Sequence, residues 1–358
     1  MSDDAANGEE IYAKAEKKLK VRVGIARARV RRRAAIHRAM ISMIFDDVDD
    51  SIESASRRRV SKRLDARASL TSVLHFSSRH QSSSVFASMF GTNKHEDAAE
   101  LFERAAIRFK LAKLWSRAAD SYDCLAECRA KTKETHEYAS ACVEAANMLR
   151  KCEKHESACA RYRSAARAYA ELGRFSQRGK HLKEVGETYE SIGKEDEAIE
   201  AYGEAASAYE GEESARTTRN ACLLKRAALL ANRDRFEEAT EIFEDVASAS
   251  VDNNLLRFSV KGYFLQAGMC RLCWCDAVGV LNALERYDER DPAFPGSRER
   301  DVLEKCARAM EDGDGDAFSR AVAEFDSMSR LDAWKTTVLL KAKKRIEAAV
   351  REEEDDLT

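Results

Sequence analysis

The chain has 358 residues, of which 44% are hydrophobic and 35% are charged, and its formal net charge is −2. No stretch approaches the roughly 18 to 20 consecutive apolar residues that a membrane-spanning helix requires. Apolar residues are too plentiful for a wholly disordered chain. The nearly balanced charge gives no overall basic field of the kind that nucleic-acid-binding proteins carry, so no nucleic-acid partner is expected.

Ten cysteines would suit a disulfide framework in a short secreted protein, but this chain is long. Its N-terminus also lacks the apolar core of a signal peptide. We therefore expect a cytoplasmic protein whose cysteines are reduced and packed in the core.

Helix-forming residues dominate the composition. The two prolines are Pro292 and Pro295, so residues 1–291 contain none. Proline is rare inside helices because it lacks an N–H group and clashes with the preceding turn. Ala, Glu, Lys, Arg and Leu are abundant and are strong helix formers, so the composition predicts an all-α protein.

The first quarter of the chain changes composition twice. Residues 1–20 contain an amphipathic pattern (GEEIYAKAEKKLK) and are predicted to form an N-terminal helix. Residues 21–81 differ, with 13 arginines and 1 lysine. This segment begins at Val21 and ends at Gln81, whose codons can supply the GT and AG ends of an intron. We expect either a translated intron or a disordered Arg-rich insert, and transcripts that lack the segment would support the intron. A further alternative is an Arg-rich transit peptide displaced from the terminus.

Residues 82–94 (SSSVFASMFGTNK) combine serine and glycine with bulky apolar residues and are predicted to form a loop. Val85, Phe86, Met89 and Phe90 are the apolar residues concerned. Aromatic side chains exposed in a loop indicate a partner surface. The alternative is that the loop folds back onto the first pair of helices.

A repeat of 40 or 41 residues organises residues 95–290. Each copy has an alanine, an aromatic residue four positions later and a second alanine three or four positions after that, which is the spacing of one helix face. The copies are Ala118, Tyr122 and Ala126; Ala158, Tyr162 and Ala165; Ala198, Tyr202 and Ala205; and Ala239, Phe243 and Ala247. A weaker series between them consists of Phe102, Cys142, Leu182, Cys222 and Tyr263.

Two helices of about 15 to 18 residues and two short turns fill one such period. Small residues let helix axes approach, and the aromatic ring fills the remaining space. Gly173, Gly193 and Gly211 mark turns. Since one helix pair cannot bury both of its faces, the pairs must stack. We predict a right-handed superhelical solenoid of antiparallel helix hairpins, similar to tetratricopeptide repeats; the alternative is an irregular helical bundle.

The repeat ends after Pro295. Residues 297–351 are predicted to form a C-terminal helical bundle that caps the solenoid, interrupted at the DGDGD stretch over 312–316. Residues 352–358 (EEEDDLT) form an acidic tail with one apolar residue, Leu357.

Several short stretches carry a family resemblance, and they occur in order along most of the chain. They are AEKKLK at 15–20, FASMFG at 86–91, AKLWSRAADSY from Ala112, ELGRF at 171–175, YEGEES from Tyr209, CLLK ending at Lys225, DPAFPGSRE from Asp291, SRLDAW at 329–334 and the EEDDL end. In these stretches the chain resembles the soluble NSF attachment proteins, and most closely the alpha type.

The resemblance implies an adaptor in vesicular membrane fusion. Such an adaptor binds assembled four-helix SNARE complexes through a basic solenoid face, recruits the hexameric ATPase NSF through its acidic C-terminus and stimulates SNARE disassembly. It catalyses nothing itself and needs no cofactor. It is cytoplasmic and associates peripherally with membranes. The alternatives are a general helical-repeat scaffold and a gamma-type attachment protein.

The resemblance also implies three groups of contact residues. The positions that match SNARE contacts are Lys113, Arg150, Lys151, Arg174, Lys180, Lys225, Arg257 and Lys261, with Arg219 as a substitute for a family lysine that is Ala221 here. Membrane contact is implied for Val85, Phe86, Met89 and Phe90, although family members often carry phenylalanine at the position of Val85. NSF contact is implied for Glu311, Asp312, Asp314, Glu353, Glu354, Asp355, Asp356 and Leu357. The alternative for each charged residue is an ordinary solvated helix face.

Enzymatic and metal-binding functions have little support in the sequence. Cys270, Cys273 and Cys275 lie close together, but no second cysteine pair or nearby histidine completes a zinc site. We expect these cysteines to be packed thiols. The chain has no glycine-rich phosphate loop of the kinds that bind nucleotides, so it is not expected to hydrolyse ATP.

Overall fold

The computed structural model describes the backbone of residues 3–18 and 85–356, and the side chains of residues 3–18 and 94–351. The Arg-rich segment over 21–81 lies outside the described residues. All the regular structure within the described ranges is helical, which confirms the all-α prediction. None of the described helices is both long and apolar enough to cross a membrane.

The first compact unit comprises residues 1–148. Residues 3–18 form a helix, and α3 (Val85–Leu111), α4 (Trp115–Thr132) and most of α5 (Thr135–Lys151) follow. The ring of Tyr12, in the N-terminal helix, meets the ring of Phe102 of α3 edge-on at 5.3 Å between centroids. Arg117 of α4 forms an ion pair with Glu9. These contacts hold the N-terminal helix against the first helix pair.

The segment that was predicted to be a loop is helical. Helix α3 begins at Val85, so residues 85–94 form its first turns and the loop prediction is wrong. The serines and Gly91 favoured a loop, but Phe86, Met89 and Phe90 have the i, i+3, i+4 spacing of one helix side. The apolar residues of this segment therefore extend α3.

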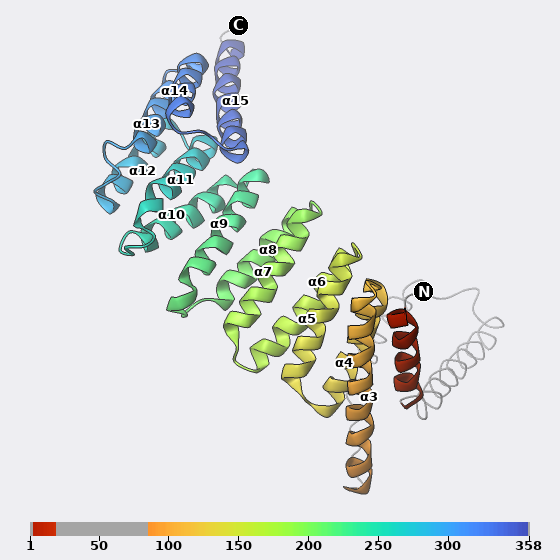
Figure 1. Ribbon diagram of the computed structural model, residues 1–358. Coiled ribbons are helices and arrows are strands. Elements are labelled where there is room, and N and C mark those ends of the chain that lie inside the picture. Colours follow the sequence, from red (N-terminus) through yellow and green to blue (C-terminus); the bar gives the residue numbers. More distant parts are fainter. Residues whose placement is uncertain (1–2, 19–84, 357–358) are drawn as a thin grey trace, which may run out of the picture. The chain divides into compact units, whose positions relative to one another are not determined.

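The second unit comprises residues 149–358. Its helices follow one another as antiparallel hairpins (Figure 1). They are α6 (His155–Glu171), α7 (Phe175–Ser191), α8 (Glu195–Ala208), α9 (Arg216–Asn232), α10 (Phe236–Ser250), α11 (Val260–Trp274) and α12 (Ala277–Arg290), with short 3-10 turns at Glu213–Ala215 and Arg257–Ser259. The odd-numbered helices α7, α9 and α11 are the first members of successive hairpins.

The repeated aromatic residues are core residues, as the spacing predicted. Tyr122, Tyr162, Tyr202 and Phe243 are buried, together with the alanines on either side of each. The weaker series is also buried from Phe102 through Cys222, whereas Tyr263 is half-buried. The 40-residue period thus corresponds to one helix hairpin.

Glycines in the first helices allow the aromatic rings to approach. A Cβ atom on Gly186 of α7 would lie 2.9 Å from ring atoms of Tyr202, and one on Gly179 would lie 2.7 Å from the ring of Tyr209. Both rings come from α8 or its end. Because these distances are shorter than any normal carbon–carbon contact, glycine is required where α7 meets α8.

The hairpin turns share one backbone conformation. Gly173 and Gly193, predicted as turn residues, have positive φ angles, as does Gly211. The equivalent turns at Lys113, Lys133, Glu153 and Asp234 use the same left-handed conformation without glycine. In these turns the left-handed residue ends one helix, and the next helical segment begins within three residues.

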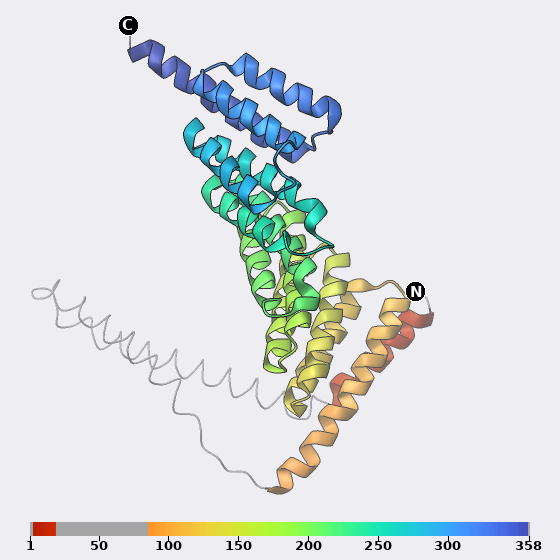
Figure 2. The same ribbon diagram turned by 90° about the vertical axis from the view of Figure 1, so that its left-hand side faces the viewer.

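The C-terminal helices form a small bundle of three. They are α13 (Arg298–Glu311), α14 (Gly315–Met328) and α15 (Ala333–Asp356), and they run side by side in Figure 2. The predicted boundary between bundle and acidic tail at 351/352 does not separate two elements, because α15 continues to Asp356. Residues 357–358 lie outside the described residues.

The glycine-to-ring contact predicts the effect of one added methyl group. Gly186→Ala should destabilise the protein by about 1 to 3 kcal/mol, because the new Cβ must push the ring of Tyr202 aside. Gly262→Ala in α11 is the matched control, since its Cβ would meet nothing within 4 Å. Urea unfolding measures both free energies. Equal stabilities of the two variants would contradict this account of the packing.

Candidate partner-binding surfaces

The predicted SNARE-contact residues of the second unit belong mainly to the first helices of the hairpins. Arg150 and Lys151 end α5, Lys180 is in α7, Lys225 is in α9 and Lys261 is in α11. Lys180 and Lys225 are exposed, and Lys261 is half-buried. The three lysines thus occupy successive helices of one series, while the continuous basic stripe itself stays a prediction.

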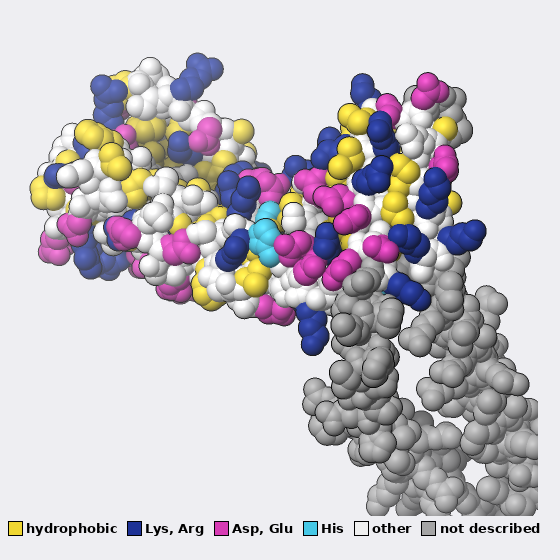
Figure 3. All heavy atoms as spheres, turned by 60° about the horizontal axis from the view of Figure 1, so that its bottom comes forward, with side chains coloured by type: hydrophobic (Ala, Val, Ile, Leu, Met, Phe, Trp, Pro, Cys, Tyr) yellow, Lys and Arg dark blue, Asp and Glu magenta, His cyan; other side chains and the backbone are white. Residues whose placement is uncertain are grey.

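Two of these cations are held by glutamates of α7. Arg150 donates to Glu184 at 2.6 Å, and Lys225 donates to Glu190 at 2.8 Å. Each pair links the first helices of neighbouring hairpins. On the face shown in Figure 3, acidic side chains likewise lie among the basic ones. Because glutamates neutralise part of its charge, the surface is less positive than its lysines and arginines alone would make it.

The Lys225 pair is anchored in the core. The buried Tyr202 donates its hydroxyl proton to Glu190 at 2.7 Å, so one carboxylate joins a core ring to a surface lysine. Burial opposes ionisation of Glu190, but the Lys225 ammonium and the Tyr202 hydroxyl bring its pKa below the ordinary value. Glu190 is therefore charged at neutral pH and fixes the position of Lys225.

Other predicted contact residues are available to a partner. Arg174, Lys180, Arg257 and Lys261 form no ion pair with another residue of the described ranges. Arg174 immediately precedes α7, and Arg257 lies in the turn before α11. Lys113 belongs to the first unit, where it is the left-handed turn residue between α3 and α4. The backbone conformation of Lys113 therefore has a role in the turn, separate from the predicted contact of its side chain with the SNARE complex.

His181, next to Lys180, adds no charge to this surface at neutral pH. Its ring is buried and stacks between those of Tyr162 and Tyr169, with centroid distances of 6.1 and 5.4 Å. Burial and the neighbouring Lys180 lower the pKa of His181 to about 4. The positive charge there comes from lysine and arginine alone.

The proposed substitution of Arg219 for a family lysine at Ala221 is poorly supported by the helix geometry. Ala221 and Lys225 are one turn apart in α9 and both are exposed. Arg219 is six residues from Lys225, which places it about 120° away around the helix. It is directed instead to Glu210, at 4.0 Å. The chain thus lacks a basic residue beside Lys225 at this position.

An apolar tip between α10 and α11 was missed by the sequence analysis. Leu255 and Phe258 are 89% and 92% exposed, more than any other large apolar side chain described. The tip is shaped by Asn253, whose side chain accepts from Leu255 N at 2.9 Å and whose carbonyl accepts from Arg257 N at 2.8 Å. The NNLLRF stretch carried a signal, since an asparagine turn precedes two adjacent leucines.

The acidic residues of the predicted NSF surface differ in their roles. Asp314 caps α14, accepting from Asp316 N at 2.9 Å and Ala317 N at 2.7 Å. The hydrogen bond from Ala317 is the main cause of its lowered pKa. Glu311 and Asp312 line a cavity of about 530 Å³ between the start of α12, the α13–α14 turn and α15.

The same cavity has an apolar floor and one further acidic residue. Ile346 and Val350 of α15 supply apolar side chains, and Asp276 at the start of α12 is a lining residue that sequence reasoning missed. Glu353 to Asp356 are part of α15, and Leu357 lies outside the described residues. Acidic and apolar groups therefore meet where α15 approaches its end.

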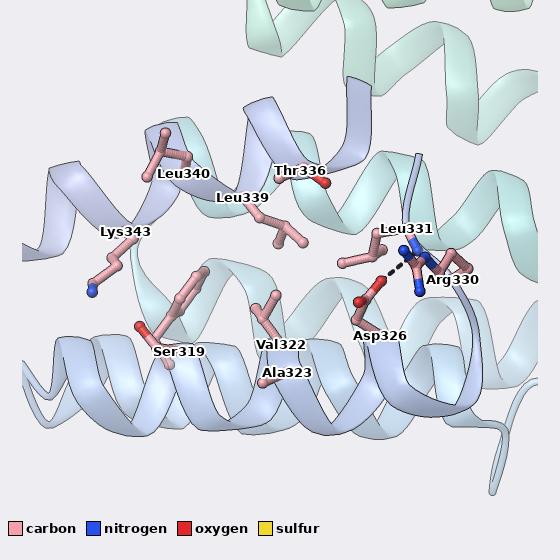
Figure 4. Close-up of a pocket in the computed structure, with 11 residues that line it drawn as sticks. Ser319, Val322, Ala323, Asp326, Arg330, Leu331, Thr336, Leu339, Leu340 and Lys343 are labelled. Carbon is pink, nitrogen blue, oxygen red and sulfur yellow. Dashed lines mark hydrogen bonds between the residues drawn. The ribbon is translucent and has the colours of Figure 1, made fainter. Parts of the chain in front are cut away.

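A second opening lies between α14 and α15 (Figure 4). This groove has a volume of about 470 Å³ and an apolar lining that includes Phe318, Val322 and Leu339. Lys343 and Arg330 lie at opposite ends of it in the close-up. No prediction from the sequence concerned this groove.

The clustered cysteines are packed, as expected from the sequence. Cys270 and Cys273 are buried in α11, and burial raises the pKa of both thiols. Cys275 is half-buried at the end of that helix. In the part of the chain that the structure describes, no group of three or more His, Cys, Asp or Glu side chains is placed to hold a metal ion.

Comparisons with known proteins place this geometry in a family. The family model for "Soluble NSF attachment protein, SNAP" matches residues 76–347. The chain is 43% identical over 270 residues to an alpha-soluble NSF attachment protein of Vitis vinifera, covering 75% of this chain and 92% of that protein. It is 37% identical over 277 residues to the alpha-soluble NSF attachment protein of Mus musculus, covering 77% and 92%.

A third relative is a probable vesicular-fusion protein sec17 homolog of Schizosaccharomyces pombe. The identity is 35% over 278 residues, which covers 78% of this chain and 94% of that protein. The matched region takes in the helix hairpins, the apolar tip and nearly all of the C-terminal bundle. The chain described here belongs to the soluble NSF attachment protein family.

Proposed function

We propose that this protein is an adaptor in vesicular membrane fusion and not an enzyme. It binds assembled four-helix SNARE complexes and recruits the hexameric ATPase NSF, which then disassembles them. The proposal is supported by the family and by relatives named as an NSF attachment protein and a probable vesicular-fusion protein. The adaptor acts in the cytoplasm, at membrane surfaces, without a cofactor.

The apolar tip beside unpaired cations is the observation that carries the SNARE-binding proposal. Leu255 and Phe258 are almost fully exposed, and Arg257 and Lys261 lie within three residues of Phe258. A four-helix bundle with acidic outer faces offers apolar grooves between its helices. The tip supplies contact area for such a groove, and the cations supply charge complementarity that orients the complex.

The basic surface contains both unpaired cations and cations that already form ion pairs. Within the described residues, the predicted contact residues without an ion pair are Arg174, Lys180, Arg257 and Lys261, and these can meet an acidic rod directly. Arg150 and Lys225 are already paired with Glu184 and Glu190. Exposed charge pairs are screened by salt. SNARE binding should therefore weaken as ionic strength rises. The apolar tip should supply the part of the binding free energy that salt does not reduce.

The recruitment of NSF is assigned to the end of α15 and the adjacent cavity. Asp276, Glu311 and Asp312 outnumber the one basic lining residue, Arg345, around an apolar floor. Glu353 to Asp356 extend the acidic character along α15. Such a surface is complementary to a basic protein face with an apolar centre. Leu357 adds an apolar anchor at the acidic end.

The membrane contact is assigned to the start of α3. Phe86, Met89 and Phe90 have the spacing of one helix side, which is a better arrangement for a lipid surface than the predicted loop. Burying one phenylalanine contributes roughly 1.5 to 3 kcal/mol. A single copy therefore binds weakly, and several copies on one SNARE complex reinforce one another.

The double substitution Leu255→Ser and Phe258→Ser tests SNARE binding. Retention by immobilised, assembled SNARE complex should fall about tenfold or more, since each apolar side chain buried contributes roughly 1.5 to 3 kcal/mol. Stability should be unchanged because both side chains are exposed. Leu111→Ser, at another exposed leucine, is the control.

Two outcomes would count against this assignment. Undiminished retention of the double variant would exclude the tip as a contact. Equal retention by assembled complexes and by single SNARE chains, unaffected by high salt, would favour a general helical-repeat scaffold.

Leu357→Ala tests the recruitment of NSF. The variant should still be retained by SNARE complexes but should lose most of its stimulation of ATP hydrolysis by NSF, since the apolar anchor is gone. Thr358→Ala, the adjacent substitution, should have no effect. ATP turnover in the presence of saturating SNARE complex is the measurement, and full stimulation by Leu357→Ala would refute the assignment.

Phe86→Ser with Phe90→Ser tests the membrane contact. NSF-driven disassembly should slow when the SNARE complex is anchored in liposomes and should stay unchanged when it is soluble. Ala87→Ser, on the same turn of α3, provides the control. If the double variant worked equally well on liposomes, the contact would lie elsewhere.

A further inference from the structure

The ends of two repeat helices expose backbone carbonyl groups. The last four carbonyls of any α-helix have no partner within the helix and attract cations through the helix dipole. In α9 these groups lie near Ala231 and Asn232, and in α11 they lie near Leu272. Side chains from another helix can donate hydrogen bonds to these carbonyl groups.

Helix α15 supplies these side chains for α9. The ammonium of Lys341 donates to the carbonyls of Ala231 at 3.4 Å and Asn232 at 3.1 Å, and it pairs with Asp234 at 2.6 Å. Lys341 also lies 5.5 Å from the ring centroid of Phe236. One lysine thus closes the end of α9 and the turn that follows it.

A second cation of α15 closes the end of α11. The guanidinium of Arg345 donates to the carbonyl of Leu272 at 3.3 Å and to that of Cys275. Lys341 and Arg345 are four residues apart, so they lie on one side of α15. Near the start of the same helix, Trp334 donates to the carbonyl of Ala228 in α9 at 3.0 Å.

These contacts connect the two surfaces of the proposed function. Helix α15 ends in the acidic segment assigned to NSF, whereas α9 and α11 carry Lys225 and Lys261, assigned to the SNARE complex. A load applied by the ATPase at the end of α15 must reach the SNARE-binding helices through the contacts of α15. Lys341 and Arg345 are the charged contacts closest to the loaded end.

We propose that Lys341 and Arg345 are positioning residues that clamp α15 to the ends of α9 and α11, so that work done by NSF on the acidic end is transmitted to the bound SNARE complex. This inference rests on the proposed function. The apolar side of α15 is packed in the core, and Lys341 and Arg345 add polar contacts to the ends of α9 and α11. When these contacts are lost, part of the work of NSF displaces α15 instead of the SNARE complex. Lys341 lines neither proposed binding surface, so the loss of its contacts should affect coupling and neither binding step. Arg345 also lines the cavity assigned to NSF, so Lys341 alone carries the test.

Lys341→Met is the first test, with Lys344→Met as the matched control. Lys344 is exposed and has the same charge, and within the described residues it forms no hydrogen bond or ion pair with α9 or α11. The measured quantity is the number of ATP molecules hydrolysed by NSF per SNARE complex released. This number should rise severalfold for Lys341→Met, while Lys344→Met matches the unmodified protein.

Hydrogen exchange in α15 tests whether losing the contacts of Lys341 loosens this helix. Hydrogen exchange of the backbone amides of residues 333–348 should accelerate about tenfold in Lys341→Met, the factor expected from losing one hydrogen bond to a charged group. SNARE retention and maximal stimulation of ATP hydrolysis should stay unchanged. Lys341→Arg, which keeps the charge and the donors, should restore both coupling and exchange.

The outcomes separate this inference from the function on which it rests. If the unmodified protein neither binds SNARE complexes nor stimulates NSF, the proposed function itself fails. If it does both and Lys341→Met keeps the same ATP cost per complex, the clamp is overturned while the function stands. The clamp is also overturned if Lys344→Met raises that cost as much as Lys341→Met does.

Discussion

The contact between Tyr202 and α7 joins the core of the second unit to its surface. The ring packs where Gly186 leaves room, and the hydroxyl donates to Glu190, which in turn holds Lys225. The position of a surface lysine is therefore set by an aromatic residue of the 40-residue repeat. Lys180, Lys225 and Lys261 are thus carried by helices that pack on the repeat core, whereas Leu255, Arg257 and Phe258 lie in the connection between α10 and α11.

The residues that form the repeat could be predicted because the pattern is local. Ala158, Tyr162 and Ala165 fall on one side of a single helix, so periodicity alone identifies them. The turns at Gly173 and Gly193 could be predicted because glycine favours the left-handed conformation. The start of α3 was assigned wrongly since serine and glycine outweighed the helical spacing of Phe86, Met89 and Phe90. In that segment, local composition and periodicity pointed to different structures.

Cross-helix features of the candidate surfaces were beyond sequence reasoning. The pairing of Lys225 with Glu190 joins residues 35 positions apart, and it depends on how α9 is rotated against α7. The contacts of Lys341 span more than 100 residues and require the bundle to be docked on the hairpins. Leu255 and Phe258 were not singled out in the sequence, and it is their exposure in the structure that identifies them.

To act as an adaptor, this protein must bind the SNARE complex and NSF at the same time. The most direct measurement follows the release of SNARE subunits from an assembled complex that contains NSF and ATP, with and without this protein. The account predicts release only when the protein is present, with the protein itself recovered unchanged. Release at the same rate in its absence, or failure of the SNARE complex to retain it, would contradict the account.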